Sequence, residues 1–406
     1  MRYFADLSIF RRNTNFALLY TGQFVSFFGT MITSVALPFQ IYKDTGSILM
    51  VGLLSLVQLI PILFTALLGG VLADRYHRRK LLLSAELFLA LGGLMLAANA
   101  GMHGESVWLI FITAALMSAF NGLHRPALDS IVQQIVPRSD FPAVAALGSF
   151  KVSVGMIVGP AVGGLLVAHT GLITTYLIDA LTFAVSFCAL LMMSHIPAPE
   201  VEFDEPVMTS LKTGLKYAVS RQELVGSYAV DFVAMIFGMP NALFPAIAQS
   251  FGGAKVLGML YSAPAVGALI VSILSGWSHK VTRHGAAIAI AAILWGFAII
   301  GFGLASNLWL ALFFLSLAGA FDAISGIFRG TMWNQTIPNK LRGRMAGIEM
   351  ISYLSGPRLG DTEASIVAAA FGLTASIVSG GVLCVVGVTI CCVALPKFWQ
   401  YHSDHS

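Results

Sequence analysis

Apart from Glu363, six ionisable side chains stand inside long apolar runs in the second half of this sequence. They are Asp231, Asp322, Arg329, Glu349, Arg358 and Asp361. A charged group surrounded by hydrocarbon usually pairs with another charge, binds a polar ligand or relays protons. These residues are therefore the candidates for proton coupling or substrate binding. For Asp231 and Asp322, interhelical ion pairing without any further role is an equally weighted alternative.

Asp231 is the first of these candidates. It lies a turn or two inside an apolar run, and the nearest preceding basic residue is Arg221, ten positions earlier. A carboxylate without a basic neighbour is costly when charged, which suits reversible proton binding. A basic partner on another helix, such as Arg329 or Arg358, would instead make Asp231 structural. Asp322 is the next candidate.

The first half carries a smaller set of the same kind, namely Glu86, Arg125, Asp129, Lys151 and Asp179. Arg125 and Asp129 are four positions apart, so a helix would place them on one face, where they can pair directly. They lie near one end of a predicted span. We interpret these two as the structural latch of a gate.

Other chemistries have no support in the residue patterns. The nine histidines and four cysteines lack metal-ligand spacing, and the cysteines fall in apolar runs where no disulfide is expected. The sequence contains no Gly-rich phosphate loop, and no set of Ser, His and Asp can be placed together. We therefore expect no metal, no cofactor and no enzymatic activity. Energy would come from an ion gradient, most simply of protons.

Composition defines the class of protein that must position these charges. The 406 residues are 57% hydrophobic and 10% charged, with a mean hydropathy of +0.84. That much apolar surface belongs in a lipid bilayer, so we predict an all-α polytopic membrane protein. A net charge of +4 gives no reason to expect nucleic acid. Residues 1–15 are polar, so we expect an uncleaved first helix.

Apolar runs of sufficient length predict about twelve transmembrane helices. They cover residues 16–42, 48–71, 81–100, 107–131, 143–168, 172–195, 224–250, 256–277, 286–305, 308–333, 344–370 and 373–395. Basic residues gather in alternate loops, and the opposite loops hold only Lys43 and Lys255. Because basic loops stay in the cytoplasm, both termini are predicted to be cytoplasmic.

Two halves are predicted to repeat each other. At a shift of 201 residues, the following pairs align: Asn121 with Asp322, Gln134 with Gln335, Pro137 with Pro338, Gly155 with Gly356 and Gly159 with Gly360. This register predicts two pseudo-symmetric six-helix bundles, at 1–195 and 222–406. Residues 196–221, with three prolines and an acidic cluster, would be a cytoplasmic linker that ends in a surface helix.

A short basic loop between the second and third spans carries the first family motif. It contains Gly70, Asp74, Arg75, Arg78 and Arg79, and its arginines can reach acids on adjacent helices. The pattern resembles the loop between helices two and three of major facilitator superfamily transporters, where it belongs to the gate. This chain has His77 where the family usually has glycine. An ordinary positive-inside anchor is the alternative.

The fifth span carries a second motif, in which Gly155, Gly159, Pro160 and Gly163 follow the order G-x-x-x-G-P-x-x-G-G. Small residues four apart permit close helix packing, and the proline bends the helix. The run resembles the antiporter signature of major facilitator exporters, which favours export. A kinked packing helix without directional meaning is the alternative.

The whole chain resembles the bacterial exporters of the catecholate siderophore enterobactin. The resemblance rests on the segments beginning at Phe10, Ala73 and Gly356. It implies proton-driven export of a siderophore by alternating access, across the bacterial cytoplasmic (inner) membrane into the periplasm. The implied partners are the siderophore, protons, the lipid bilayer and an outer-membrane exit channel that receives the cargo. A broad-specificity drug/proton antiporter and, with less support, a major facilitator importer are the alternatives.

Overall fold

The computed structural model describes residues 7–75, 77–102, 104–194, 207–338 and 341–403. Within these residues the chain forms helices and no strand, and ten helices are long and apolar enough to cross a membrane. The predicted all-α polytopic class is thereby confirmed. The chain divides into two compact units. Unit 1 comprises Met1–Gly46 and Val57–Phe203, and unit 2 comprises Ser47–Leu56 and Asp204–Ser406.

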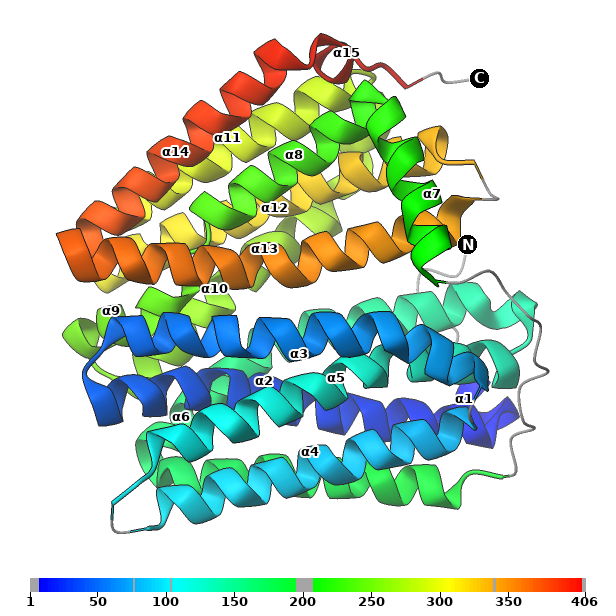
Figure 1. Ribbon diagram of the computed structural model, residues 1–406, viewed down its shortest axis with the longest axis vertical. Coiled ribbons are helices and arrows are strands. Elements are labelled where there is room, and N and C mark those ends of the chain that lie inside the picture. Colours follow the sequence, from blue (N-terminus) through cyan, green and yellow to red (C-terminus); the bar gives the residue numbers. More distant parts are fainter. Residues whose placement is uncertain (1–6, 76, 103, 195–206, 339–340, 404–406) are drawn as a thin grey trace. The chain divides into compact units, whose positions relative to one another are not determined.

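Unit 1 consists of long helices that lie side by side (Figure 1). They are α1 Ile9–Arg12, α2 Thr14–Thr45, α3 Ile48–Arg75 (from Val57 onward), α4 Arg78–Ala100, α5 Val107–Ile135 and α6 Phe141–Met192, with the short helix η1 Arg138–Asp140 before α6. Asn13 begins α2 by accepting the Phe16 N–H at 2.9 Å. Its side chain thus satisfies one of the amides that a helix start leaves without a partner.

Two helices explain why ten candidate spans correspond to twelve predicted ones. Helix α6 is 52 residues long, but Gly171 inside it has φ 80° and ψ 176°, so the run is two helices joined at a non-helical glycine. Only glycine adopts this backbone conformation readily. Helix α13, Arg342–Phe371, is long enough to span. It is too polar to count by composition, because Arg358, Asp361 and Glu363 lie within six residues.

Unit 2 contains the remaining helices. They are α7 Val207–Ser220, α8 Gln222–Phe237, α9 Phe244–Phe251, α10 Ala254–Leu274, α11 His284–Gly303, α12 Leu308–Thr336, α13, α14 Leu373–Ala394 and α15 Pro396–Trp399, with the short helices η2 Asn241–Leu243 and η3 Ser275–Lys280. Helix α7, predicted as the end of a linker, packs onto this unit. Tyr217 in α7 donates to the Thr336 carbonyl at 2.7 Å, and Ala218 is buried against Leu224 and Met345.

The predicted span at 224–250 is present but is not one continuous helix. Helix α8 ends at Phe237, Gly238 follows as its cap, and Pro240 precedes η2. Proline cannot donate a backbone hydrogen bond, so the ladder of α8 cannot continue through it. The short helix η2 and α9 complete the span, and Asp231 stands in its first segment.

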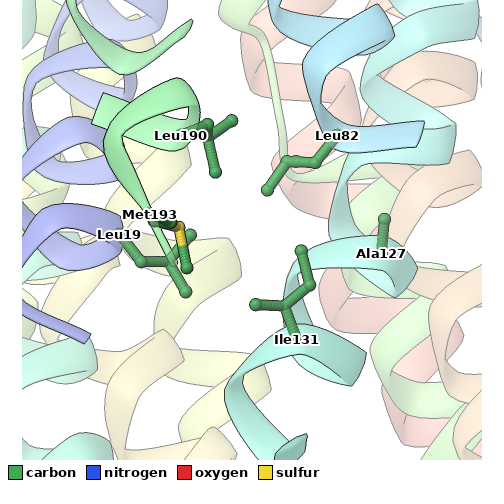
Figure 2. Close-up of a cluster of buried hydrophobic side chains, with 6 residues drawn as sticks. All are labelled: Leu19, Leu82, Ala127, Ile131, Leu190 and Met193. Atoms are coloured by element: carbon green, nitrogen blue, oxygen red, sulfur yellow. The ribbon is translucent and has the colours of Figure 1, made fainter. Parts of the chain in front are cut away.

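One apolar cluster joins four helices of unit 1. Figure 2 shows its side chains pointing toward one another; they are Leu19, Leu82, Ala127, Ile131, Leu190 and Met193. They come from α2, α4, α5 and the end of α6. Burying aliphatic side chains of this size stabilises the folded state by about 1.5–3 kcal/mol each in water, and close packing keeps its value in lipid. The cluster therefore fixes the ends of α4, α5 and α6, where the loop arginines lie.

Candidate functional site

A buried ion pair stands inside unit 2. Arg329 on α12 contacts the carboxylate of Asp231 on α8. The two side chains are only 12% and 7% exposed, so little water screens the pair. Removing one partner of such a pair costs about 3–5 kcal/mol, because the other charge is left buried without compensation.

The pair does not stand alone. Arg329 also lies 3.9 Å from Asp322, whose side chain is 50% exposed. Asp322 and Arg329 are seven positions apart on α12, so both project from the same face, two turns apart. Glu349 on α13 adds a further negative charge that interacts with Arg329. The guanidinium of Arg329 thus interacts with three carboxylates, and these carboxylates differ in solvent exposure.

A cavity of about 240 Å³ opens beside this cluster. Its lining combines charged, aromatic and small side chains: Asp231, Met235, Gly326, Arg329, Gly330, Trp333, Glu349, Ser352 and Tyr353. Trp333 is held in place by stacking on Tyr228, with ring centroids 5.0 Å apart, and by donating from Nε1 to Ser227 at 3.1 Å. The arrangement can accept hydroxyl groups on its carboxylates and offers an aromatic face to a flat ring.

Four of the six predicted residues therefore come together, and two do not. Asp361 accepts the Ala242 backbone N–H at 2.9 Å, so it holds η2 where the seventh span is interrupted. Arg358 donates to the Leu354 carbonyl of its own helix at 3.1 Å. Neither side chain lines the described cavity. The idea that Asp231 lacks a basic neighbour holds along the sequence but not in space, because α12 supplies Arg329.

The loop motif is described only in part. For Gly70, Asp74 and Arg75 the structure describes the helical backbone of α3 but not the side chains or their surroundings. Arg78 donates to the Ser130 carbonyl at 3.4 Å. Arg79 donates to the carbonyls of Leu190 and Leu191 at 2.9 and 2.8 Å, so it caps the end of α6. Within the part of the chain that the structure describes, these hydrogen bonds of Arg79 are to backbone carbonyls, and an acidic partner for it stays a prediction.

The glycine motif brings α6 against α2. A Cβ placed on Gly155 or Gly159 would overlap Phe27 or Met31, and one on Gly163 would lie 3.0 Å from the Ile32 backbone. Pro160 stands buried within the same helix. The three glycines therefore form a contact surface that larger residues would open. Whether this surface sets the direction of transport stays a prediction.

The predicted latch residues Arg125 and Asp129 both lie exposed on α5. Among the described residues no ion pair within 4.0 Å joins their side chains. Asp129 interacts electrostatically with Arg125, and also with Lys151 of α6 and His124. The charges thus form a loose group around one end of α5, and their role in gating stays a prediction.

Unit 1 also buries polar groups that were not predicted as site residues. Glu86 on α4 contacts Gln23, His124 and Ser186, and Asp179 on α6 accepts the Thr33 hydroxyl at 2.5 Å. A signal for them exists in α2, where polar residues recur on the buried face at Gln23, Ser26, Thr33 and Gln40. These positions are three or seven residues apart, the spacing of one helix face.

Long apolar helices that bury ion pairs and enclose a polar cavity define a polytopic membrane transporter. The fold is similar to that of a POT family transporter solved with 5-aminolevulinic acid, with a TM-score of 0.75 and 13% identity over 95% of this chain and 97% of that one. It is also similar to the nucleoside transporter NupG, with a TM-score of 0.72 and 14% identity over 95% and 99%. At these identities the likeness concerns the fold alone.

The chain belongs to the major facilitator superfamily, in the family described as transmembrane secretion effector, whose model matches residues 5–405. The predicted resemblance to this superfamily is confirmed. Relatives include the enterobactin exporter EntS of Shigella flexneri, 28% identical over 87% of this chain and 85% of the relative. EntS of Salmonella typhi is 26% identical over 87% and 86%. The chain thus belongs to a family of secretion transporters, which is not an enzyme class.

Proposed function

We propose that this protein exports a catecholate siderophore of the enterobactin type in exchange for protons. The observation that carries the proposal is the unit 2 cavity, which two carboxylates, Asp231 and Glu349, and one arginine line beside an aromatic wall, with Asp322 3.9 Å from the same arginine. The similarity to enterobactin exporters over 87% of the chain supports the cargo class. The glycine motif of α6 supports export over import.

The cargo chemistry matches the cavity. An iron-free catechol is flat, aromatic and mostly uncharged near neutral pH, and it carries two adjacent hydroxyl donors. A carboxylate can accept both hydroxyls, while Trp333 and Tyr353 offer ring faces to the catechol. Arg329 can donate to carbonyl oxygens of the siderophore backbone. A cavity of about 240 Å³ holds one catechol arm rather than a whole siderophore.

Exchange follows from competition at the carboxylates. A deprotonated Asp231 or Asp322 accepts catechol hydroxyls strongly, whereas a protonated carboxyl accepts them more weakly and releases the cargo. Facing the alkaline cytoplasm, the site would lose its proton and load; facing the acidic periplasm, it would gain a proton and unload. Proton and cargo thus alternate in one site, which is the requirement for antiport.

The orientation belongs to the same proposal. Alternating basic loops support placing both termini in the cytoplasm and the protein in the bacterial inner membrane. Residues 1–195 and 222–406 would be the two bundles, which rock during alternating access, and residues 196–221 the connection between them. Cargo released into the periplasm would pass to an outer-membrane exit channel.

The test uses everted membrane vesicles with an acidic interior. Vesicles that contain this protein should accumulate a radiolabelled catecholate siderophore, and collapsing the pH gradient should abolish the accumulation. Cells that express the protein should secrete more catechol than cells that lack it. Accumulation of a cationic dye with no catechol uptake would replace this proposal with the drug/proton antiporter. Catechol uptake that ignores the pH gradient would remove proton coupling.

A further inference from the structure

A fully buried carboxyl outside the unit 2 site belongs to Glu86 of α4. Its side chain has no exposed surface. One oxygen, Oε1, accepts from Gln23 Nε2 at 2.6 Å and from the Ser186 hydroxyl at 2.9 Å, and it faces His124 Nε2 at 3.0 Å. Helices α2, α5 and α6 each contribute one of these partners. The contacts converge from three directions on a single oxygen.

Hydrogen bonds between Gln23, Ser186 and Glu86 determine how the two neutral donors are oriented. Gln23 Nε2 also donates to Ser186 at 3.1 Å, so the Ser186 hydroxyl must turn its hydrogen toward Glu86. The second oxygen, Oε2, is buried and has no hydrogen-bond partner among the described residues. Two neutral donors on one oxygen do not compensate a full buried charge. A proton added to the carboxyl or to the imidazole would compensate that charge.

His124 lies between the buried carboxyl of Glu86 and the surface of the unit. Its side chain is 16% exposed, whereas Glu86 is completely enclosed. The charged groups around the pair are Arg125 and Asp129 on α5 and Lys151 and Asp179 on α6. The partner from α2 is the neutral Gln23. An imidazole that joins a buried acid to a wetter, charged surface is suited to pass protons between them.

We propose that Glu86 and His124 form a proton-binding site that holds one exchangeable proton inside unit 1. In uptake, Nδ1 of His124 gains a proton from water, and the proton on Nε2 moves across the 3.0 Å contact to Oε1 of Glu86. The imidazole ends neutral and the carboxyl ends as the acid. Release runs through the same steps in reverse, so charge and protons balance in each direction.

This site goes beyond the exchange proposed for unit 2, since it requires no cargo and uses residues of the other unit. Only its consequence for transport rests on the proposed proton coupling. The competing account is a static hydrogen-bond network in which Glu86 never changes its protonation state. The two accounts differ in whether a glutamic acid signal depends on pH.

The experiment records infrared difference spectra of the full-length protein in lipid vesicles, without cargo, as the pH is lowered. We expect a buried carboxylic acid band that grows with acidification and is lost in Glu86→Gln. Asp179→Asn is the matched control, because Asp179 is equally buried but accepts a hydrogen bond from Thr33 and not from a histidine. The Glu86 band should survive in that variant. Identical pH-dependent spectra for wild type and Glu86→Gln would overturn the proposal.

Two further measurements keep the test independent of how well one variant folds. Carbon-13 in the glutamate carboxyl groups should move the band in the wild-type protein, and an unmoved band would assign it to aspartate and overturn the proposal. His124→Asn should keep the band but move the pH at which it appears, while an unchanged pH would contradict the role of the imidazole. Failure of wild-type vesicles to accumulate catechol would overturn the proposed function and leave this site intact.

Discussion

The two helical units each bury a carboxyl against a basic side chain, but the bases differ in kind. In unit 1 Glu86 contacts His124, and imidazole is the side chain that exchanges protons in the physiological pH range. In unit 2 Asp231 contacts Arg329, and a guanidinium keeps its charge in proteins. The unit 1 pair can therefore change protonation in place. The unit 2 pair must first separate, which links its protonation to whatever competes for Arg329.

The predicted internal repeat does not extend to these charges. At the shift of 201 residues, His124 of α5 aligns with Ser325 and Arg329 of α12 aligns with Leu128. The helices and packing glycines recur while the ionisable residues do not. Removing the base from each pair measures the difference between the two pairs.

The largest effect is expected when the unit 2 base is removed. Arg329→Met should lower the free energy of unfolding by about 3–5 kcal/mol, because it leaves Asp231 buried and unpaired. His124→Met should cost less, since Glu86 can become neutral by taking a proton. Denaturant unfolding of the purified protein measures both. Adding Asp231→Asn to Arg329→Met should restore most of the loss, and equal costs for the two single variants would refute the distinction between the pairs.

A smaller effect tests the close packing of unit 1. Gly159→Ala should destabilise the protein by about 1–3 kcal/mol, because the added methyl overlaps Met31 of α2. Gly148→Ala on the same helix is the matched control, since nothing lies within 4 Å of its added methyl. The measurement is the thermal unfolding midpoint of both variants. Equal shifts would show that the glycine motif is not a contact surface. Gly159→Leu should additionally abolish export while the protein still inserts.

The smallest effect concerns the loop arginine that caps α6. Arg79→Gln should cost about 0.3–1 kcal/mol, since it removes a cation from the carbonyls of Leu190 and Leu191 at a helix end. The cost should shrink in high salt, because the interaction lies near the surface. Arg79→Lys should retain part of the stabilising interaction with these carbonyls. A large loss of unfolding free energy that does not depend on salt would indicate that Arg79 has an acidic partner instead.

Much of this architecture could be predicted from residue type and spacing. Apolar run length predicts the spans, and the glycine spacing in α6 predicts its close contact with a neighbour. The break at Gly171 falls in the gap between the predicted spans 143–168 and 172–195. The interruption after Phe237 was not predicted, although Gly238 and Pro240 stand there in the sequence.

The partners of the buried charges could not be predicted, because they depend on how each helix is rotated about its axis. Sequence separation gave no reason to choose Arg329 over Arg358 for Asp231, and α13 turns Arg358 toward its own backbone. The same limit applied to Glu86, whose three partners come from three other helices. The composition of an apolar helix says little about how the helix is rotated about its axis. Packing contacts with neighbouring helices determine that rotation.

Asp231→Asn in vesicles tests the central claim most directly, with Glu363→Gln on α13 as the control for loss of a carboxyl outside the cavity. The account predicts that Asp231→Asn still exchanges labelled for unlabelled siderophore but no longer concentrates it against a gradient, whereas Glu363→Gln does both. Uphill accumulation by Asp231→Asn at the wild-type level would contradict coupling at Asp231 and move it to Asp322.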